Sequence, residues 1–134
     1  MNDHLHQLAD RIRNDLVELG RVVGRVDEGW ARSKRSTDDY YLDSVALNLH
    51  GFYSGLERVF ERITAAVDGF KPGGESWHQA LLQQMRKEVP GVRPAVISDE
   101  AREGLEEFRC FHGSGRSYLR LQSFWTSRRK QTDD

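Results

Sequence analysis

One run of apolar residues, spaced alternately by three and by four positions, constrains this chain more than any other feature. The run occupies residues 42–63 and has no interruption. Because an α-helix turns once every ~3.6 residues, this spacing places all members of the run on one side of a long helix that must be buried. The members are Leu42, Val45, Leu49, Phe52, Leu56, Val59 and Ile63.

A second long helix is predicted before this central one. It begins near Asn2 or Asp3, since either side chain can cap a helix. The segment 27–37 contains Gly29 and several hydroxyl and charged residues, and we expect it to connect the two helices. The apolar stripe of the first helix consists of Leu5, Leu8, Ile12, Leu16, Leu19, Val23 and Val26.

Two shorter helices are predicted after the glycine-rich segment 69–74, which ends the central helix. Ser76 is the expected cap of a third helix that stops before Pro90, and Ser98 is the expected cap of a fourth. The sequence contains no repeat and no strand pattern. The prediction is an all-α fold, an antiparallel up-and-down helical bundle of four to five helices.

Composition limits the class of protein. A chain of 134 residues with 37% hydrophobic content fits one domain, and its net charge of −1 gives no overall attraction to nucleic acid or membrane. The single cysteine, Cys110, excludes an internal disulfide. No apolar run is long enough to span a bilayer. We therefore expect a soluble, cytoplasmic protein that does not associate with membranes.

The histidines do not form a metal-binding pattern. His50 lies beside the central stripe, His78 follows Trp77, and His4 and His6 lie close to the N-terminus. Neither cysteine nor carboxylate recurs near them at the spacing of metal ligands. We expect packed or solvated histidines, with neither a metal nor a cofactor.

Four segments of the chain together resemble the HepT-like toxins of the HEPN superfamily. The most specific is Asp39–Glu61, which contains Asn48-Leu49-His50-Gly51-Phe52-Tyr53; the others are Trp77–Leu82, Arg93–Ser98 and Leu105–Arg109. The resemblance covers residues 1–111. It implies a helical homodimer that acts as a metal-independent endoribonuclease. It also implies the role of toxin in a bacterial toxin–antitoxin pair whose antitoxin is a minimal nucleotidyltransferase.

The resemblance also implies where catalysis would occur. In this family the fourth helix ends in an Arg-x4-6-His motif, often extended to His-x-Tyr. The histidine can transfer protons near neutral pH, and the arginine can hold the scissile phosphate and stabilise its developing charge. The 2′-hydroxyl of the RNA is then the nucleophile. The tyrosine is the residue that the partner nucleotidyltransferase adenylylates.

The chain departs from the family at this motif. Its arginine and histidine positions hold His112 and Ser117, within His112-Gly113-Ser114-Gly115-Arg116-Ser117-Tyr118. The character of the sequence also changes here, because residues 109–132 contain six basic residues and no acidic one. We therefore divide the chain into a HEPN-like helical domain, residues 1–111, and an altered tail, residues 112–134. We expect the tail to be partly disordered, apart from docking of Phe124 and Trp125.

A frameshift is one explanation of the altered tail. Back-translation of Phe111–Phe124 with permitted codons, read one base later, can give a His-x-Tyr sequence with histidine at position 117 and tyrosine at position 119. The shifted reading does not restore the arginine. A tail that diverged naturally is the alternative explanation.

Several candidate site residues and functions follow. His112 and Arg116 are candidate remnants of the catalytic pair, Arg109 is a candidate RNA contact, and Tyr118 is a candidate modification site. The alternative without a functional role is that His112 and Arg116 are simply exposed to solvent. The main hypothesis is an inactive variant of a toxin that cleaves RNA, with transfer RNA as the target by family analogy. The alternatives are a non-catalytic helical module that binds a nucleotidyltransferase and a nucleotide-binding scaffold.

Overall fold

The computed structural model describes residues 2–36 and 40–112 and places them in four α-helices. A single π-helical turn, Thr64–Asp68, continues the second helix. Within the described ranges there is no strand, only an isolated bridge between Val89 and Arg93. The predicted all-α helical bundle is therefore confirmed. Its helices are α1 (Asn2–Ser33), α2 (Tyr40–Ile63), α3 (Trp77–Arg86) and α4 (Asp99–His112).

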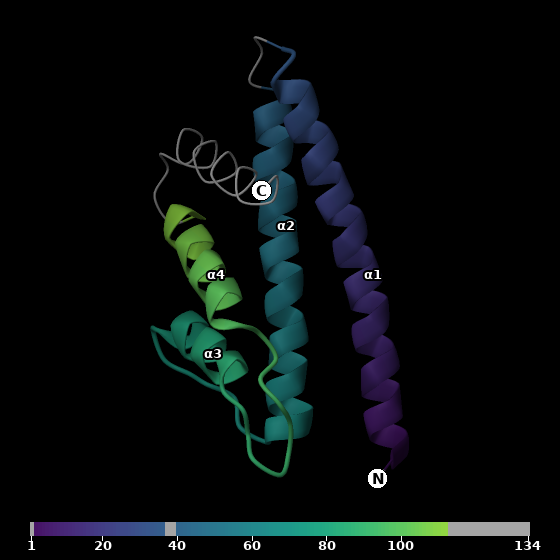
Figure 1. Cartoon of the computed structure of the whole chain (residues 1–134), viewed down its shortest axis with the longest axis vertical. Coiled ribbons are helices and arrows are strands. Elements are labelled where there is room, and N and C mark those ends of the chain that lie inside the picture. Colours follow the sequence, from purple (N-terminus) through teal and green to yellow (C-terminus); the bar gives the residue numbers. More distant parts are fainter. Residues whose placement is uncertain (1, 37–39, 113–134) are drawn as a thin grey trace.

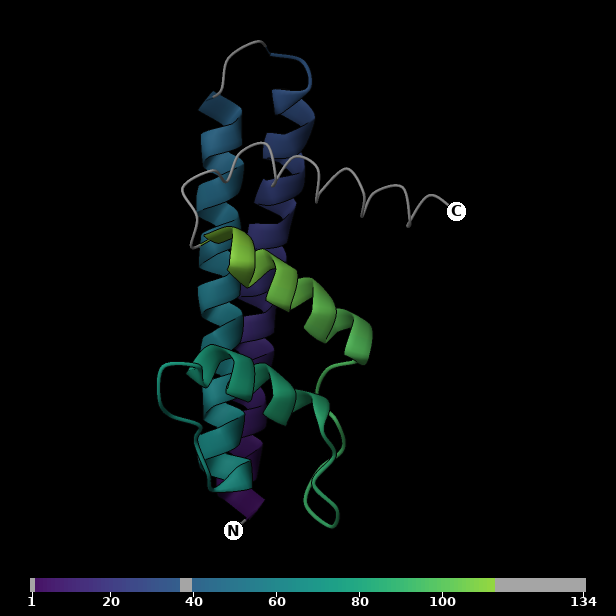
Figure 2. The ribbon, with the colours of Figure 1, turned by 90° about the vertical axis from the view of Figure 1, so that its left-hand side faces the viewer.

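The four helices form a long hairpin with two short helices on one side of it. Helices α1 and α2 run antiparallel and side by side over most of their length (Figure 1). Helices α3 and α4 cross α2 obliquely and contact each other, as the view turned by 90° shows (Figure 2). Helix α2 is therefore the central element of the fold.

The expected connection at residues 27–37 is too long, because α1 continues to Ser33. The last turns of α1 are held by tertiary packing. Trp30 is only 3% exposed, and a Cβ atom on Gly29 would lie 3.0 Å from a methyl carbon of Val45. Burial against α2 outweighs the weak helix propensity of glycine. The spacing analysis missed this part of the helix because Gly29 and the polar residues around it interrupt the stripe.

The buried residues form two clusters along α2. The cluster at the C-terminal part of α2, here called the lower cluster, joins α2 to α3. It includes Phe60, Leu81, Leu82 and Met85, each no more than 2% exposed. The upper cluster joins α2 to the end of α1 and to α4, and its members are Val26, Trp30, Val45, Leu49, Tyr53 and Phe108. Predicted stripe residues of α2 belong to both clusters, which confirms that α2 supplies the core.

A buried ion pair fixes the turn after α2. Gly69 ends the π-helical turn with φ of 71°, a left-handed conformation that suits glycine. Asp68, just before it, accepts hydrogen bonds from Nε and Nη2 of Arg93, at 2.6 and 2.7 Å. The two side chains are 5% and 7% exposed. Arg93 also donates to the backbone oxygens of Gln84 and Lys87, so the pair ties the turn to the end of α3.

The segment between α3 and α4 is held by its backbone. The N–H groups of Val96 and Ile97 both donate to the carbonyl oxygen of Met85, at 2.8 and 3.3 Å. The Ser98 hydroxyl then accepts from the N–H of Ala101 at 3.1 Å, so the predicted cap of α4 is confirmed. The predicted cap of α3 is only partly right. Ser76 precedes α3, but its side chain makes no capping hydrogen bond.

The substitution Asp68→Asn is expected to destabilise the fold. It leaves the Arg93 guanidinium buried without its counter-charge, which costs about 3 kcal/mol of unfolding free energy. Urea denaturation of the variant measures the loss. The matched control is Asp10→Asn, which removes an exposed pair with Arg13 and should change stability by less than about 1 kcal/mol. Equal effects of the two substitutions would contradict the structural role of the pair.

The same pair predicts a loss of stability in acid. The hydrogen bonds from Arg93 lower the pKa of Asp68 below its ordinary value of 3.8. The folded state therefore binds the proton more weakly than the unfolded state does. The stabilisation is present above pH 3.8 and is lost as the pH falls through the lower folded-state pKa of Asp68. In Asp68→Asn this acid-dependent contribution should be absent from the pH dependence of unfolding.

Two glycines of α2 should respond differently to alanine. A Cβ atom on Gly51 meets nothing within 4 Å, so Gly51→Ala should stabilise the fold by about 0.5–1 kcal/mol through helix propensity alone. A Cβ atom on Gly55 would lie 2.7 Å from Cδ2 of Leu19, which must move. Gly55→Ala should therefore gain less than Gly51→Ala, or lose stability. Thermal unfolding of both variants measures the difference, and a larger gain at Gly55 would contradict the close packing of α1 on α2.

Candidate functional site

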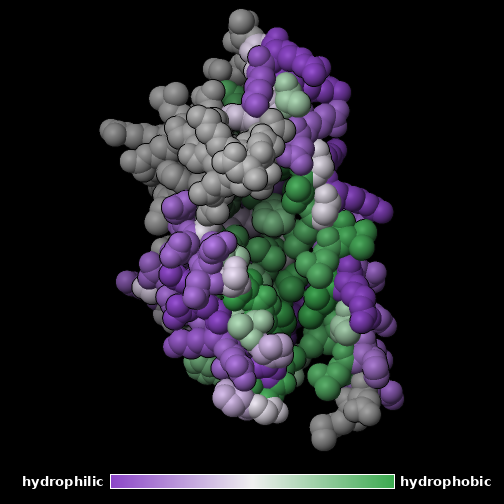
Figure 3. All heavy atoms as spheres, in the orientation of Figure 1, coloured by the Kyte–Doolittle hydropathy of each residue, from purple (hydrophilic) through white to green (hydrophobic). Residues whose placement is uncertain are grey.

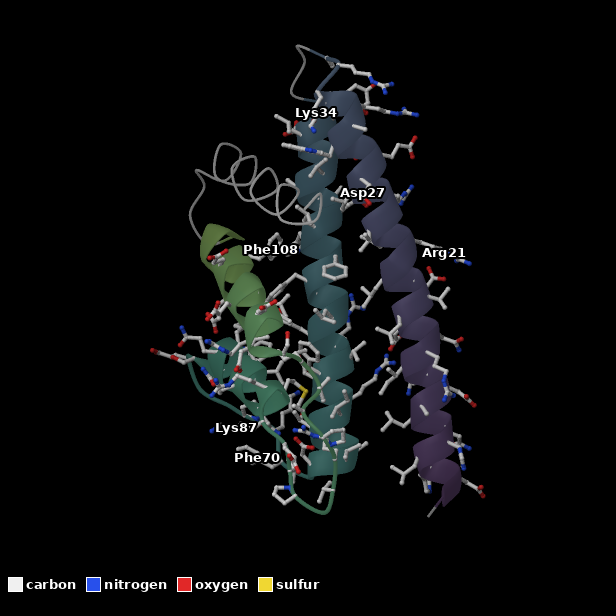
Figure 4. All side chains as sticks on the ribbon, in the orientation of Figure 1. Arg21, Asp27, Lys34, Phe70, Lys87 and Phe108 are labelled. Carbon is white, nitrogen blue, oxygen red and sulfur yellow. The ribbon has the colours of Figure 1, made fainter. Side chains whose placement is uncertain are left out.

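The candidate site lies at the C-terminal end of α4, which the upper cluster anchors. Phe108 projects from α4 toward α2 (Figure 4). Its ring lies 5.5 Å from that of Tyr53, centroid to centroid, and the two planes are tilted by 33°. Phe108 is 8% exposed and Tyr53 is 6% exposed. This aromatic contact anchors the C-terminal part of α4 on α2.

Arg109 and His112 occupy the last turn of α4. Their backbones are helical, and they are three positions apart in the sequence. Their side chains are outside the part of the chain that the structure describes, as is that of Cys110. A spacing of three is shorter than the five to seven positions of the family motif. Arg109 and His112 therefore belong to the last turn of α4, and their spacing does not reproduce that motif.

The other predicted site residues lie outside the described residues. These are Arg116, Ser117 and Tyr118, with the rest of the tail from residue 113 onward. Their proposed roles, and the boundary between residues 111 and 112, stay predictions. The sequence itself does establish one point: an arginine followed by a histidine after four to six residues occurs nowhere in the 134 residues.

The histidines of the described region take separate places. His4 and His6 are exposed on the first turns of α1, and His50 is exposed on α2. His78 is half-buried, and its Nδ1 lies 2.5 Å from Oε2 of Glu57, which links α3 to α2. Within residues 2–36 and 40–112, no three histidine, cysteine or acidic side chains gather where a metal ion could be held.

An apolar groove runs between α2 and α4, beside the candidate site. We call it the α2–α4 groove; Leu49, Phe52 and Leu56 line one wall, and Ala101, Leu105 and Phe108 line the other. Its volume is about 530 Å³. In the space-filling view, hydrophobic side chains form a continuous band over the open face between α1 and the short helices (Figure 3).

The described fold and the family comparison agree on the class of protein. The fold is that of a small all-α protein built on a helical hairpin. The sequence model of the family described as "HepT-like protein" matches residues 44–130, which is more than half of the chain. The chain therefore belongs to the HepT-like family, whose members are generally part of toxin–antitoxin pairs. Neither a curated protein nor a solved structure matches the chain.

The matched range has a bearing on the tail. It continues past His112 to residue 130, and so includes most of the segment that the frameshift hypothesis treats as foreign. Among the described residues, no helix is both long and apolar enough to cross a membrane.

Sequence reasoning missed the polar contacts that position the short helices. The pairs Asp68–Arg93 and Glu57–His78 join residues 25 and 21 positions apart. Periodicity reports neighbours on one helix, and it carries no information about partners so far apart. Asp68 and Arg93 border predicted turns, where charged residues are ordinarily solvated, so their positions in the sequence indicated exposed charges and not a buried pair.

Removing the aromatic anchor should loosen the end of α4. Phe108→Ala deletes a buried ring and should cost about 3 kcal/mol of unfolding free energy. Compared with the original chain, Phe108→Ala should show faster amide hydrogen exchange in α4, and a smaller change in the α1–α2 hairpin. The control, Glu107→Ala, changes an exposed neighbour and should alter stability by no more than about 0.5 kcal/mol. Unchanged exchange in α4 of Phe108→Ala would show that the ring does not hold the helix.

Proposed function

We propose that this protein is the toxin-type subunit of a HEPN and nucleotidyltransferase toxin–antitoxin pair. Its parent form is a metal-independent endoribonuclease that acts on RNA in the cytoplasm, with transfer RNA as the target by analogy with the family. The chain as it stands does not cleave RNA. One observation carries this proposal: a HepT-like sequence that lacks the Arg-x4-6-His motif.

The chemistry of the parent form explains why this motif is indispensable. Attack of the RNA 2′-hydroxyl on the adjacent phosphate needs a base to accept the hydroxyl proton and an acid to protonate the leaving 5′-oxygen. An imidazole near neutral pH can do either. A guanidinium can hold two phosphate oxygens and stabilise the added charge. The products are a 2′,3′-cyclic phosphate and a 5′-hydroxyl, so the reaction is balanced without a metal ion.

The residues that remain at these positions do not provide that chemistry. His112 occupies the arginine position, and an imidazole does not offer the planar fork of donors of a guanidinium. Ser117 occupies the histidine position, and a hydroxyl does not titrate near neutral pH. Arg109 could still contact RNA through phosphate. Charge attraction without proton transfer gives binding rather than cleavage.

The absence of the Arg-x4-6-His motif also favours a second candidate function. A HepT-like chain without a catalytic pair can serve as a non-catalytic module that binds its nucleotidyltransferase partner. The helical surface is present in the described residues, whereas the catalytic motif is absent from the sequence. Tyr118 keeps a phenolic hydroxyl close to the position where the family presents one for adenylylation. Binding of a nucleotidyltransferase with no RNA cleavage is the result that this alternative predicts.

Association with a second copy is part of the proposal. Leu5, Leu16 and Val23 lie along one edge of α1 and are 53%, 51% and 38% exposed. Such apolar edges on a small helical hairpin favour a subunit contact. Sedimentation equilibrium of the full chain tests for the homodimer.

Restoring the motif should create nuclease activity. The purified chain in EDTA should not cleave RNA, whereas His112→Arg with Ser117→His recreates Arg-x4-His. Since general acid–base catalysis contributes about 10²–10⁴-fold, cleavage by this double variant should exceed the assay background, measured with the original chain, at least ~100-fold. His112→Arg alone, which supplies a guanidinium without the imidazole, is the matched control.

Cleavage by the unaltered chain would contradict the proposed loss, provided that a mock purification shows none and that His112→Ala abolishes it. The origin of the tail is tested separately by sequencing the coding DNA. If the frame shifted by one base does not encode Val-His-x-Tyr, the frameshift hypothesis is wrong and the tail diverged naturally.

A further inference from the structure

The α2–α4 groove is lined mainly by apolar side chains, and the chain itself contains a segment that matches it. We propose that residues 116–130 fold back after α4 and bind in this groove, with Tyr118, Leu121, Phe124 and Trp125 in contact with its walls. The occupant is therefore the C-terminal segment of the same chain, not a second copy. The inference does not depend on whether the protein cleaves RNA.

The first support is the length of chain available and where it starts. Helix α4 is described up to His112, next to Phe108 at the upper end of the groove. Gly113-Ser114-Gly115 follows, and connections of two to five residues are typical between antiparallel helices. The groove extends along α4 from Phe108 to Glu100, nine residues or about 14 Å of helix, and continues to Ser98 and Ile97. Residues 118–130 are long enough to span it.

The second support is the spacing of apolar residues in that segment. Tyr118, Leu121 and Trp125 follow one another at intervals of three and four, and Phe124 widens the stripe. On a helix these four residues share one side. Leu119 lies on the opposite side of the same helix. The segment thus has one apolar face, which suits a groove that is apolar on both walls.

The third support is charge complementarity. Residues 116–130 contain Arg116, Arg120, Arg128, Arg129 and Lys130 and no acidic residue. The exposed surface of α4 contains Glu100, Glu103 and Glu107, and Glu100 is itself part of the groove lining. A segment that runs antiparallel to α4 brings Arg128 and Arg129 to the end of the groove where Glu100 lies. Opposite charges along this edge favour that direction.

Photo-crosslinking of the full-length chain tests the proposal. p-Benzoyl-L-phenylalanine in place of Trp125 should crosslink to residues 49–56 and 97–108 in the groove. The same photoreactive residue in place of Leu119, off the apolar side, should give few such crosslinks. The sample is an equal mixture of ¹⁴N- and ¹⁵N-labelled protein, so that mass spectrometry separates crosslinks within a chain from those between chains.

The proposal predicts crosslinks within one isotope label only. Mixed ¹⁴N–¹⁵N pairs would overturn it, because they would mean that a second copy supplies the segment. Crosslinks scattered outside the groove, or none, would overturn it as well.

A second measurement does not require the photoreactive residue. Leu121→Asp with Trp125→Asp should raise the fluorescence of bound 8-anilinonaphthalene-1-sulfonate at least about twofold, because it uncovers the groove. Leu119→Asp, a like change on the opposite side, should leave it unchanged. Equal responses of the two variants would count against docking. A failure of these tests would leave the proposed loss of nuclease activity untouched, since that is measured with RNA.

Discussion

Burial of α2 on more than one side is the constraint on which the rest of this structure depends. Its lower part packs Phe60 and Ile63 with α3, and its upper part packs Leu49 and Tyr53 with α4. On another side, α1 packs closely against α2, with Gly29 of α1 and Gly55 of α2 at the contact. Because α1 makes its main contacts with α2, and both buried clusters contain residues of α2, this helix connects the hairpin to the two short helices.

The sequence was sufficient to predict the helices but not the way in which they are joined. The stripe from Leu42 to Ile63 and the cap at Ser98 are local features, and both are present in the structure. The predicted end of α1 was wrong because the burial of Trp30 and the packing of Gly29 against Val45 depend on tertiary contacts. The Asp68–Arg93 pair was missed for the same reason, since nothing local distinguishes those charges from solvated ones.

The candidate site illustrates a further limit of sequence reasoning. The resemblance to HepT-like proteins, which the family match over residues 44–130 supports, predicts the catalytic motif at the end of α4 and in the residues that follow. In the sequence the two motif positions hold His112 and Ser117, not an arginine and a histidine. The structure adds what the motif alone lacks: Phe108 and Tyr53 fix the end of α4, and an apolar groove lies directly beside it.

The central claim is that a HepT-like scaffold without this pair does not cut RNA, and analysis of RNA ends in living cells tests it most directly. Transesterification through the 2′-hydroxyl leaves 2′,3′-cyclic phosphates, which ligation-based sequencing can count across all cellular RNAs. Bacteria that express the unaltered chain should show no more of these ends than cells with an empty vector. A set of new cyclic-phosphate ends that appears on induction of the chain, and is lost with His112→Ala, would contradict the account.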